Sequence, residues 1–278
     1  RKVKKLTPQQ LGDEDEIDAD VMAEAQRVQG GGADNDVVKV STLRKIYPSS
    51  TGVKLAVKST SLGIPRGECF GLLGINGAGK STTLAMLSGE IPPTSGEAFL
   101  ASFNVSSNAE DIHRLVGYCP QFDALFPTLT AREHLRLYAA IKASAKPDHL
   151  NEKIEEMGLT QYADRQAGGY SGGNKRKLSV AIAMIGDPQI VFLDEPSTGM
   201  DPMARRFMWN VIMRIVTENK ECAMILTTHS MEECEALCQR IGIMVGGRIR
   251  CLGSSQHLKT RFGKGYQLEA SVTSSSAQ

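Results

Sequence analysis

Residues 74–81 are Gly74-Ile75-Asn76-Gly77-Ala78-Gly79-Lys80-Ser81, a glycine loop that closes on a lysine and a hydroxyl residue. Glycines allow consecutive backbone N–H groups to turn inward around an anion. A helix that begins directly after the loop adds the positive end of its dipole. The apolar stretch 69–73 precedes the loop, and the helix-like stretch 83–87 follows it. This context predicts a phosphate-binding loop in an α/β fold.

The loop supplies a set of candidate nucleotide contacts. Lys80 is expected to reach the β- and γ-phosphates, and the Ser81 hydroxyl is expected to coordinate Mg²⁺. The predicted contacts are Gly74, Asn76, Gly77, Gly79, Lys80, Ser81 and Thr82. The alternative, a glycine-rich turn with a chance lysine, leaves the flanking strand and helix unexplained.

Strand and helix signals alternate around the loop, which predicts a mostly parallel sheet. The stretches 189–193 and 223–226 are apolar on both faces, as central parallel strands are. Two glycines at 246–247 separate short strands and predict a hairpin. Between about 122 and 185 the pattern becomes helical, with a capping box at 130–133. We interpret this region as a helical subdomain inserted into a P-loop NTPase core that also has an N-terminal antiparallel β part.

The two ends of the chain differ from this core in composition. Residues 1–36 carry a basic start, an acidic run and three consecutive glycines, so we expect a charged, flexible connector. A short helix is predicted within it over 20–28. The globular domain is expected to span 37–265, and 266–278 to begin a regulatory segment or tail.

Bulk composition narrows the classes of partner. The 278 residues carry 32 basic and 31 acidic side chains, so the net charge does not favour binding to the phosphates of nucleic acid. Nucleic acid is therefore not expected as a partner. The six cysteines show no paired metal-ligand spacing, and we interpret them as reduced thiols. No apolar run approaches the roughly 20 residues that cross a bilayer. The chain starts at Arg1 rather than Met, so we expect a piece of a longer protein.

A series of motifs follows the loop in a fixed order. The members are Gln121, Ser171-Gly172-Gly173-Asn174, Asp194-Glu195 and His229. A GTPase would need Asn-Lys-x-Asp to bind its base, and the nearest string, 174–177, ends in lysine. The series resembles the ATP-binding cassette (ABC) ATPase family over about residues 37–265. The resemblance implies that the nucleotide is ATP, bound with Mg²⁺.

Each later motif has a chemical role of its own. Asp194 ends a buried strand beside the loop, where a carboxylate can hold Mg²⁺ directly or through water. Glu195 follows it and is expected to act as general base on the attacking water. The Gln121 amide oxygen can coordinate Mg²⁺ or accept a hydrogen bond from that water. His229 can hydrogen-bond the γ-phosphate and sense its loss.

Tyr47 resembles the aromatic residue that stacks on adenine in this family. Such stacking tolerates any base and contributes about 1–3 kcal/mol. Each of these candidates also has a structural alternative. Tyr47 could instead be a core tyrosine, and Gln121 a polar residue of a loop. Asp194 and Glu195 could cap the helix that follows them, and His229 could be a surface histidine.

Ser171, Gly172 and Gly173 begin a predicted helix whose free N–H groups form a second anion site. The family resemblance implies that this segment binds the γ-phosphate of a nucleotide held by an opposing cassette, so that ATP joins two domains. The usual family motif begins with leucine and ends with glutamine, whereas this chain has Tyr170 and Asn174. The basic cluster at 175–177 is interpreted as a solvated helix face.

Longer strings, among them 118–124, 171–179 and 229–238, resemble subfamily A of the eukaryotic ABC transporters. The resemblance implies a long polypeptide with two membrane domains and two cassettes, whose members mostly move lipids. This chain would then lie on the cytoplasmic face of a membrane protein and contact its transmembrane domains. The alternatives are a soluble ABC ATPase without a transport role, and a degenerate cassette that binds ATP without hydrolysing it.

Overall fold

The computed structural model describes residues 17–49, 52–142 and 147–263. Its N-terminal sheet has the strand order β2-β1-β4-β5, and each neighbouring pair runs antiparallel. The strands of this sheet are β1 (Val38–Ser49), β2 (Gly52–Ile64), β4 (Ser95–Leu100) and β5 (Phe103–Asn104). This sheet is the predicted antiparallel β part, which is thereby confirmed.

The second sheet has the order β10-β9-β3-β8-β7-β6 and is parallel from β9 to β6. Every residue of β7 and β8 is buried, as expected for strands covered on both faces. The predicted hairpin joins β9 to β10 through Gly246-Gly247. The strands are β3 (Cys69–Leu73), β6 (Val116–Cys119), β7 (Ile190–Asp194), β8 (Ala223–Thr228), β9 (Arg240–Val245) and β10 (Arg248–Gly253).

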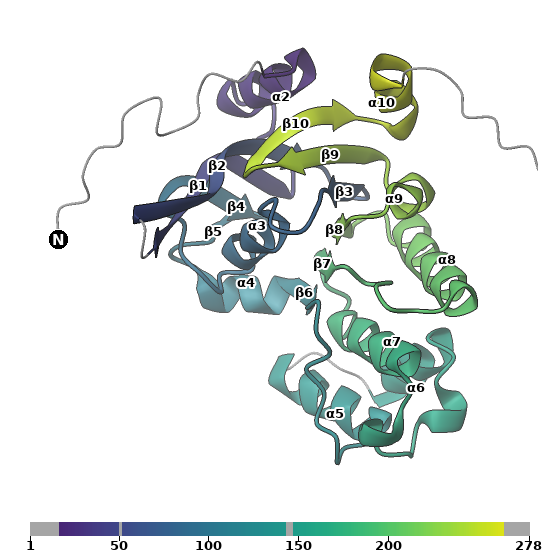
Figure 1. The fold of residues 1–278 in the computed structure, drawn as a ribbon. Helices are drawn as coiled ribbons and strands as arrows, with labels where there is room; N and C mark the ends of the chain where they lie inside the picture. The colour runs from purple at the N-terminus through teal and green to yellow at the C-terminus, as the bar shows by residue number, and fades with distance from the viewer. Residues whose placement is uncertain (1–16, 50–51, 143–146, 264–278) are drawn as a thin grey trace, which may run out of the picture.

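A group of helices is inserted between β6 and β7 and forms a lobe below the sheets in Figure 1. The lobe contains α5 (Ala131–Lys142), α6 (Pro147–Glu156), the short 3₁₀ turns at Thr160–Tyr162 and Ala167–Gly169, and α7 (Gly172–Ala183). Leu135, Ile154, Met157 and Leu178 are buried in one cluster and hold the lobe together. The predicted helical insertion is confirmed.

The helix α5 begins at the predicted capping box. The Thr130 backbone N–H donates to Glu133 Oε2 at 2.8 Å, and the Glu133 N–H donates to Thr130 Oγ1 at 3.2 Å. This reciprocal pair satisfies two backbone donors that a helix start leaves free. The other helices are α3 (Lys80–Leu87), α4 (Ala109–Leu115), α8 (Pro202–Glu218), α9 (Met231–Leu237) and α10 (Ser255–Phe262).

The N-terminal segment differs from the expectation of an unpacked connector. Its predicted helix is α2 (Ala19–Gln29), which contacts β2 and β10 at the top of Figure 1. Arg27 donates to Asp36 at 2.7 Å, and Glu24 lies 3.5 Å from Arg240. Arg27 thus pairs within the segment and Glu24 pairs with a residue far along the chain, so a charge-rich composition does not prevent packing. Residues 1–16 and 266–278 lie outside the described residues.

Burial beside α2 gives one carboxyl group an unusual pKa. Desolvation raises the pKa of Glu68 from 4.5 to about 7, although Arg240 Nε lies 3.2 Å from its Oε1. The folded chain thus binds this proton more tightly than the unfolded chain. The resulting stability is complete below pH 4.5 and is lost as the pH rises to about 7. One pKa unit corresponds to about 1.4 kcal/mol, so the loss is roughly 3 kcal/mol.

Replacing Glu68 by glutamine is therefore expected to remove this part of the pH dependence. Denaturant unfolding of the wild type and of Glu68→Gln, compared between pH 4.5 and 8, measures the difference. The exposed Glu97 provides a control, and Glu97→Gln is expected to follow the wild-type curve. Parallel curves for the wild type and Glu68→Gln would contradict the expectation.

Across residues 17–49, 52–142 and 147–263, no helix combines the length and the apolar character of a membrane span.

Candidate functional site

The glycine loop wraps closely around the start of α3. Lys80 is only 4% exposed, and its ammonium donates to the Gly74 carbonyl at 2.6 Å and to the Ile75 carbonyl at 3.2 Å. Gly79 has φ +111°, and a Cβ there would lie 2.6 Å from the Ala56 carbonyl oxygen. Only glycine fits both the conformation and the space, so the backbone can follow this tight path.

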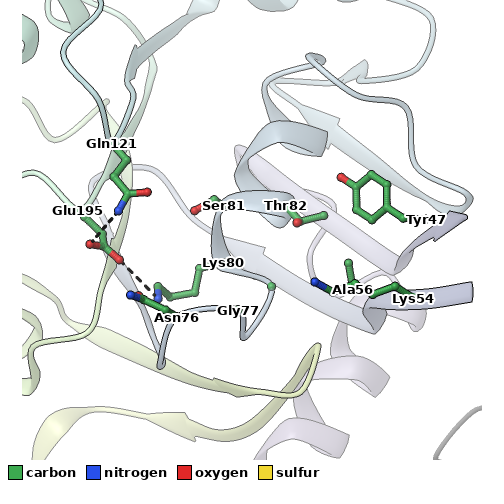
Figure 2. A pocket seen from close by; sticks show the side chains of 11 residues that line it. Tyr47, Lys54, Ala56, Asn76, Gly77, Lys80, Ser81, Thr82, Gln121 and Glu195 are labelled. Carbon is green, nitrogen blue, oxygen red and sulfur yellow. Dashed lines mark hydrogen bonds and ion pairs between the residues drawn. The ribbon is translucent and has the colours of Figure 1, made fainter. Parts of the chain in front are cut away.

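The loop forms one wall of a pocket of about 270 Å³, shown in Figure 2. Most of the predicted site residues line it: Tyr47, Asn76, Gly77, Gly79, Lys80, Ser81, Thr82, Gln121 and Glu195. Tyr47 lies at one end, and Gln121 and Glu195 face the loop from the other. The pocket thus collects residues of β1 and β2, of the glycine loop with the start of α3, and of the segments that follow β6 and β7.

Two lining residues, Lys54 and Ala56, were not predicted. Both lie on β2, and Lys54 pairs with Tyr47 across the β1–β2 ladder. The ladder has register shifts between Val40 and Ile46, which the sequence pattern does not indicate. Neither residue belongs to a motif, so only the strand pairing places them beside the predicted aromatic residue.

Oxygen ligands lie together where α3 begins. Ser81 Oγ donates to Asp194 Oδ1 at 3.3 Å, and the buried Thr227 hydroxyl donates to the same carboxylate oxygen. A hydroxyl and a carboxylate are ligands that suit Mg²⁺. The residues present therefore fit this ion. Thr227 is a further site residue, and the β7–β8 register, in which it pairs with Asp194, places it there.

Glu195 is the centre of a polar cluster, although it is only 5% exposed. Its carboxylate Oε1 lies 3.7 Å from Lys80 Nζ. Its Oε2 accepts from Thr198 Oγ1 at 3.1 Å and from Gln121 Nε2 at 3.4 Å, and lies 3.5 Å from His229 Nδ1. The amide nitrogen of Gln121 thus faces Glu195, whereas the predicted contacts with Mg²⁺ or water involve its amide oxygen. Figure 2 shows the contacts of Glu195 with Lys80 and Gln121.

The backbone at Glu195 has φ +50°, an uncommon value for a residue with a side chain. Its N–H donates to the Thr227 carbonyl at 3.0 Å and lies 3.2 Å from Thr227 Oγ1. A residue held in this region costs of the order of 1–3 kcal/mol, which the surrounding contacts must offset.

The second predicted anion site lies elsewhere, at the start of α7. Ser171 and Gly172 are exposed and, like Gly173 and Asn174, do not line the pocket. The Ser171 hydroxyl accepts from the Asn174 N–H at 3.3 Å and caps the helix. The two helix starts are therefore separate features of the chain.

Tyr170 accounts for one departure from the usual family motif. Its side chain is mostly buried, and its hydroxyl donates to the Tyr162 carbonyl. The two rings meet edge to face with centroids 5.8 Å apart. The aromatic residue thus anchors the loop before α7 to the helical lobe.

The interpretation of 175–177 as a solvated face is wrong for Arg176. This side chain is 4% exposed and donates to main-chain carbonyls on two loops beside the pocket. Lys175 and Lys177 are partly exposed, as a solvated face requires. The position of Arg176 on the helix allows its side chain to point inward. Its partners are main-chain carbonyls, which every residue has, so no sequence pattern identifies them.

Comparison with known proteins shows which family this chain is similar to. The model of the family described as "ABC transporter" matches residues 57–198. Human ATP-binding cassette sub-family A member 2 is 54% identical over 264 residues, 94% of this chain and 11% of that protein. Rattus norvegicus sub-family A member 7 is 52% identical over 97% of this chain and 12% of its own length. Human retinal-specific phospholipid-transporting ATPase ABCA4 is 51% identical over 96% of this chain and 12% of its own length.

Solved structures agree on the fold. A dimeric ATP-binding cassette in a post-hydrolysis state, bound to ADP and Pi, has a TM-score of 0.73 at 22% identity. That match covers 78% of this chain and 98% of the other. The ATP-binding subunit of an ABC transporter has the same TM-score at 25% identity, over 82% of this chain and 93% of that one. The resemblance to subfamily A is confirmed, and the chain belongs to the ABC transporter family.

Proposed function

We propose that this chain is an ATP-hydrolysing cassette that pairs with a second cassette around ATP to power transport across a membrane. One observation carries the proposal. Lys80 and Glu195, from the loop and from the end of β7, lie 3.7 Å apart at one wall of the pocket. A phosphate-binding cation and a carboxylate able to accept a proton from water are both needed for hydrolysis.

In this proposal Lys80 and the N–H groups of the loop bind the β- and γ-phosphates. Glu195 accepts the proton of the attacking water, and Gln121 and His229 orient that water and the γ-phosphate. Tyr47 stacks on the adenine. Ser81, Asp194 and Gln121 would hold Mg²⁺, which supplies neutralisation of phosphate charge when it is bound.

The start of α7 supports the pairing of two cassettes. At the start of α7, Ser171 and Gly172 are exposed and Gly173 and Asn174 are partly exposed, all outside the pocket, and the N-terminus of a helix attracts anions. This helix start suits an anion that belongs to another domain. One of the similar solved structures is a dimeric cassette bound to ADP and Pi.

The relatives support the choice of transport. The chain spans 11–12% of the length of these sub-family A proteins, one of which is named a phospholipid-transporting ATPase. We infer that the whole protein is a membrane protein whose transmembrane domains contact this cassette on the cytoplasmic face. Phospholipids are the proposed cargo.

The role of Ser171 can be tested in the full-length protein, reconstituted into phospholipid vesicles that contain a fluorescent phospholipid. Ser171→Ala is expected to lower ATP hydrolysis and lipid movement about tenfold, because one hydrogen bond to the γ-phosphate is lost. Ser254→Ala is the matched control, since Ser254 caps α10 and accepts from the His257 N–H at 3.2 Å. Both variants lose a helix cap of about 1 kcal/mol, but only the first is expected to lose turnover.

Equal activity of the two variants would contradict the pairing of cassettes through Ser171. Normal ATP hydrolysis without any lipid movement would favour an ABC ATPase without a transport role. ATP binding without hydrolysis in the wild type would identify a degenerate cassette.

A further inference from the structure

Arg176 lies in the first turns of α7 and reaches into the space between the two loops that carry Gln121 and Glu195. The side chain is 4% exposed. Burial of a guanidinium is unfavourable unless its charge and its N–H donors are satisfied. The hydrogen bonds of this guanidinium therefore show which parts of the fold it stabilises.

One edge of the guanidinium binds the loop around Glu195. Arg176 Nε donates to the Pro196 carbonyl at 3.0 Å, and Nη2 donates to the Asp194 carbonyl at 2.5 Å. These residues directly flank Glu195, whose own backbone has φ +50°. A single side chain thus holds the carbonyls on both sides of a strained residue, which keeps its carboxylate in one place.

The other edge binds the glutamine loop. Arg176 Nη1 donates to the Pro120 carbonyl, to the Gln121 carbonyl at 3.3 Å and to Asp123 Oδ1 at 3.4 Å. Asp123 Oδ1 also accepts from Ser179 Oγ at 2.9 Å, one turn further along α7. Gln121 is therefore fixed relative to the same helix as Glu195.

We propose that Arg176 is a positioning residue for ATP hydrolysis, which holds Gln121 and Glu195 together and links them to the helix that begins at Ser171. This inference rests on the proposed function. In that function the start of α7 contacts the nucleotide of the opposing cassette, while Glu195 acts on the nucleotide of its own. Arg176 thus joins the two sites through one rigid helix, so that closure around one nucleotide sets the geometry at the other.

The guanidinium is needed for this role because its planar fork presents five donors in fixed directions. Lysine keeps the charge but has a single nitrogen, which cannot bind both loops at once. In the full-length protein, Arg176→Lys is expected to lower kcat for ATP at least tenfold, with KM changed less than twofold. Photolabelling of this cassette by an azido-ATP is expected to stay at the wild-type level. Arg214→Lys, at an exposed position of α8, is the matched control and is expected to behave as wild type.

A second variant keeps the test decisive if Arg176→Lys does not fold. Asp123→Asn removes the carboxylate that binds Nη1 but leaves both main-chain contacts of the Glu195 loop. It is expected to lower kcat severalfold, again with little change in KM. In a Glu195→Gln background, Arg176→Lys is expected to add no further loss, since both changes act on the same proton transfer.

Wild-type kcat in a folded Arg176→Lys protein would overturn the proposal. If Arg176→Lys does not fold, wild-type kcat in Asp123→Asn would overturn it. A parallel loss of kcat and photolabelling in a folded Arg176→Lys protein would also overturn it, because it would place Arg176 in nucleotide binding. Failure of the proposed function gives a different result. In that case Glu195→Gln itself retains turnover, whereas failure of the present inference leaves Glu195→Gln inactive and Arg176→Lys active.

Discussion

Replacing Glu195 by glutamine is expected to abolish most ATP hydrolysis while leaving ATP binding intact. The substitution keeps the size of the side chain and removes its capacity to accept a proton. General-base catalysis contributes about 10²- to 10⁴-fold to such reactions, and kcat is expected to fall by that factor. ATP affinity is expected to be unchanged or higher, because the repulsion between a buried carboxylate and the γ-phosphate disappears.

The measurement is steady-state hydrolysis by the full-length protein, together with nucleotide binding at equilibrium. Glu155→Gln is a suitable control, since it makes the same chemical change at an exposed position of α6. Hydrolysis at the wild-type rate by Glu195→Gln would remove this carboxylate from the chemistry and leave the polar cluster around it without a catalytic role.

Lys80→Ala is expected to act one step earlier, on the binding of the triphosphate. The ammonium is held by the Gly74 and Ile75 carbonyls at the floor of the loop, with Glu195 3.7 Å away. Hydrogen bonds to charged groups contribute about 1.5–3 kcal/mol. Their loss is expected to weaken ATP binding by about 10- to 100-fold. The effect on AMP is expected to be small, because AMP lacks the β- and γ-phosphates.

Titration of the variant with ATP and with AMP tests this expectation. Lys220→Ala removes an exposed lysine far from the loop in sequence and is expected to bind ATP as the wild type does. Unchanged ATP affinity in Lys80→Ala would contradict the assignment of residues 74–82 as the phosphate site.

The sequence predicted those parts of the fold that have local signals. The strands β7 and β8 are fully buried, and their stretches 190–193 and 223–226 are apolar, so they are recognisable without knowledge of their neighbours. The capping box at Thr130 and the hairpin at Gly246-Gly247 also depend on residues close in sequence. The grouping of Asp194 and Glu195 with the glycine loop was predictable as well. These residues come directly after parallel strands, whose carboxyl ends lie at one edge of the sheet.

The features that escaped prediction depend on contacts between distant residues. Lys54 enters the pocket because β2 pairs with β1 in a shifted register. The segment around Glu24 packs because Arg240, far along the chain, lies 3.5 Å away. Arg176 lies between two lysines in the sequence, and three consecutive basic residues indicate a solvent-exposed surface. In the structure its side chain is buried and its N–H groups donate to main-chain carbonyls. Carbonyl groups are present in every residue, so no sequence pattern identifies such a partner.

The shared ATP site between two cassettes can be observed directly by electron cryomicroscopy of the full-length Glu195→Gln protein with ATP and Mg²⁺. We expect the Ser171 end of α7 within hydrogen-bond distance, about 3 Å, of a γ-phosphate bound by the opposing cassette. A closed, ATP-bound protein in which Ser171 faces solvent, and each nucleotide contacts one cassette alone, would contradict the proposed pairing.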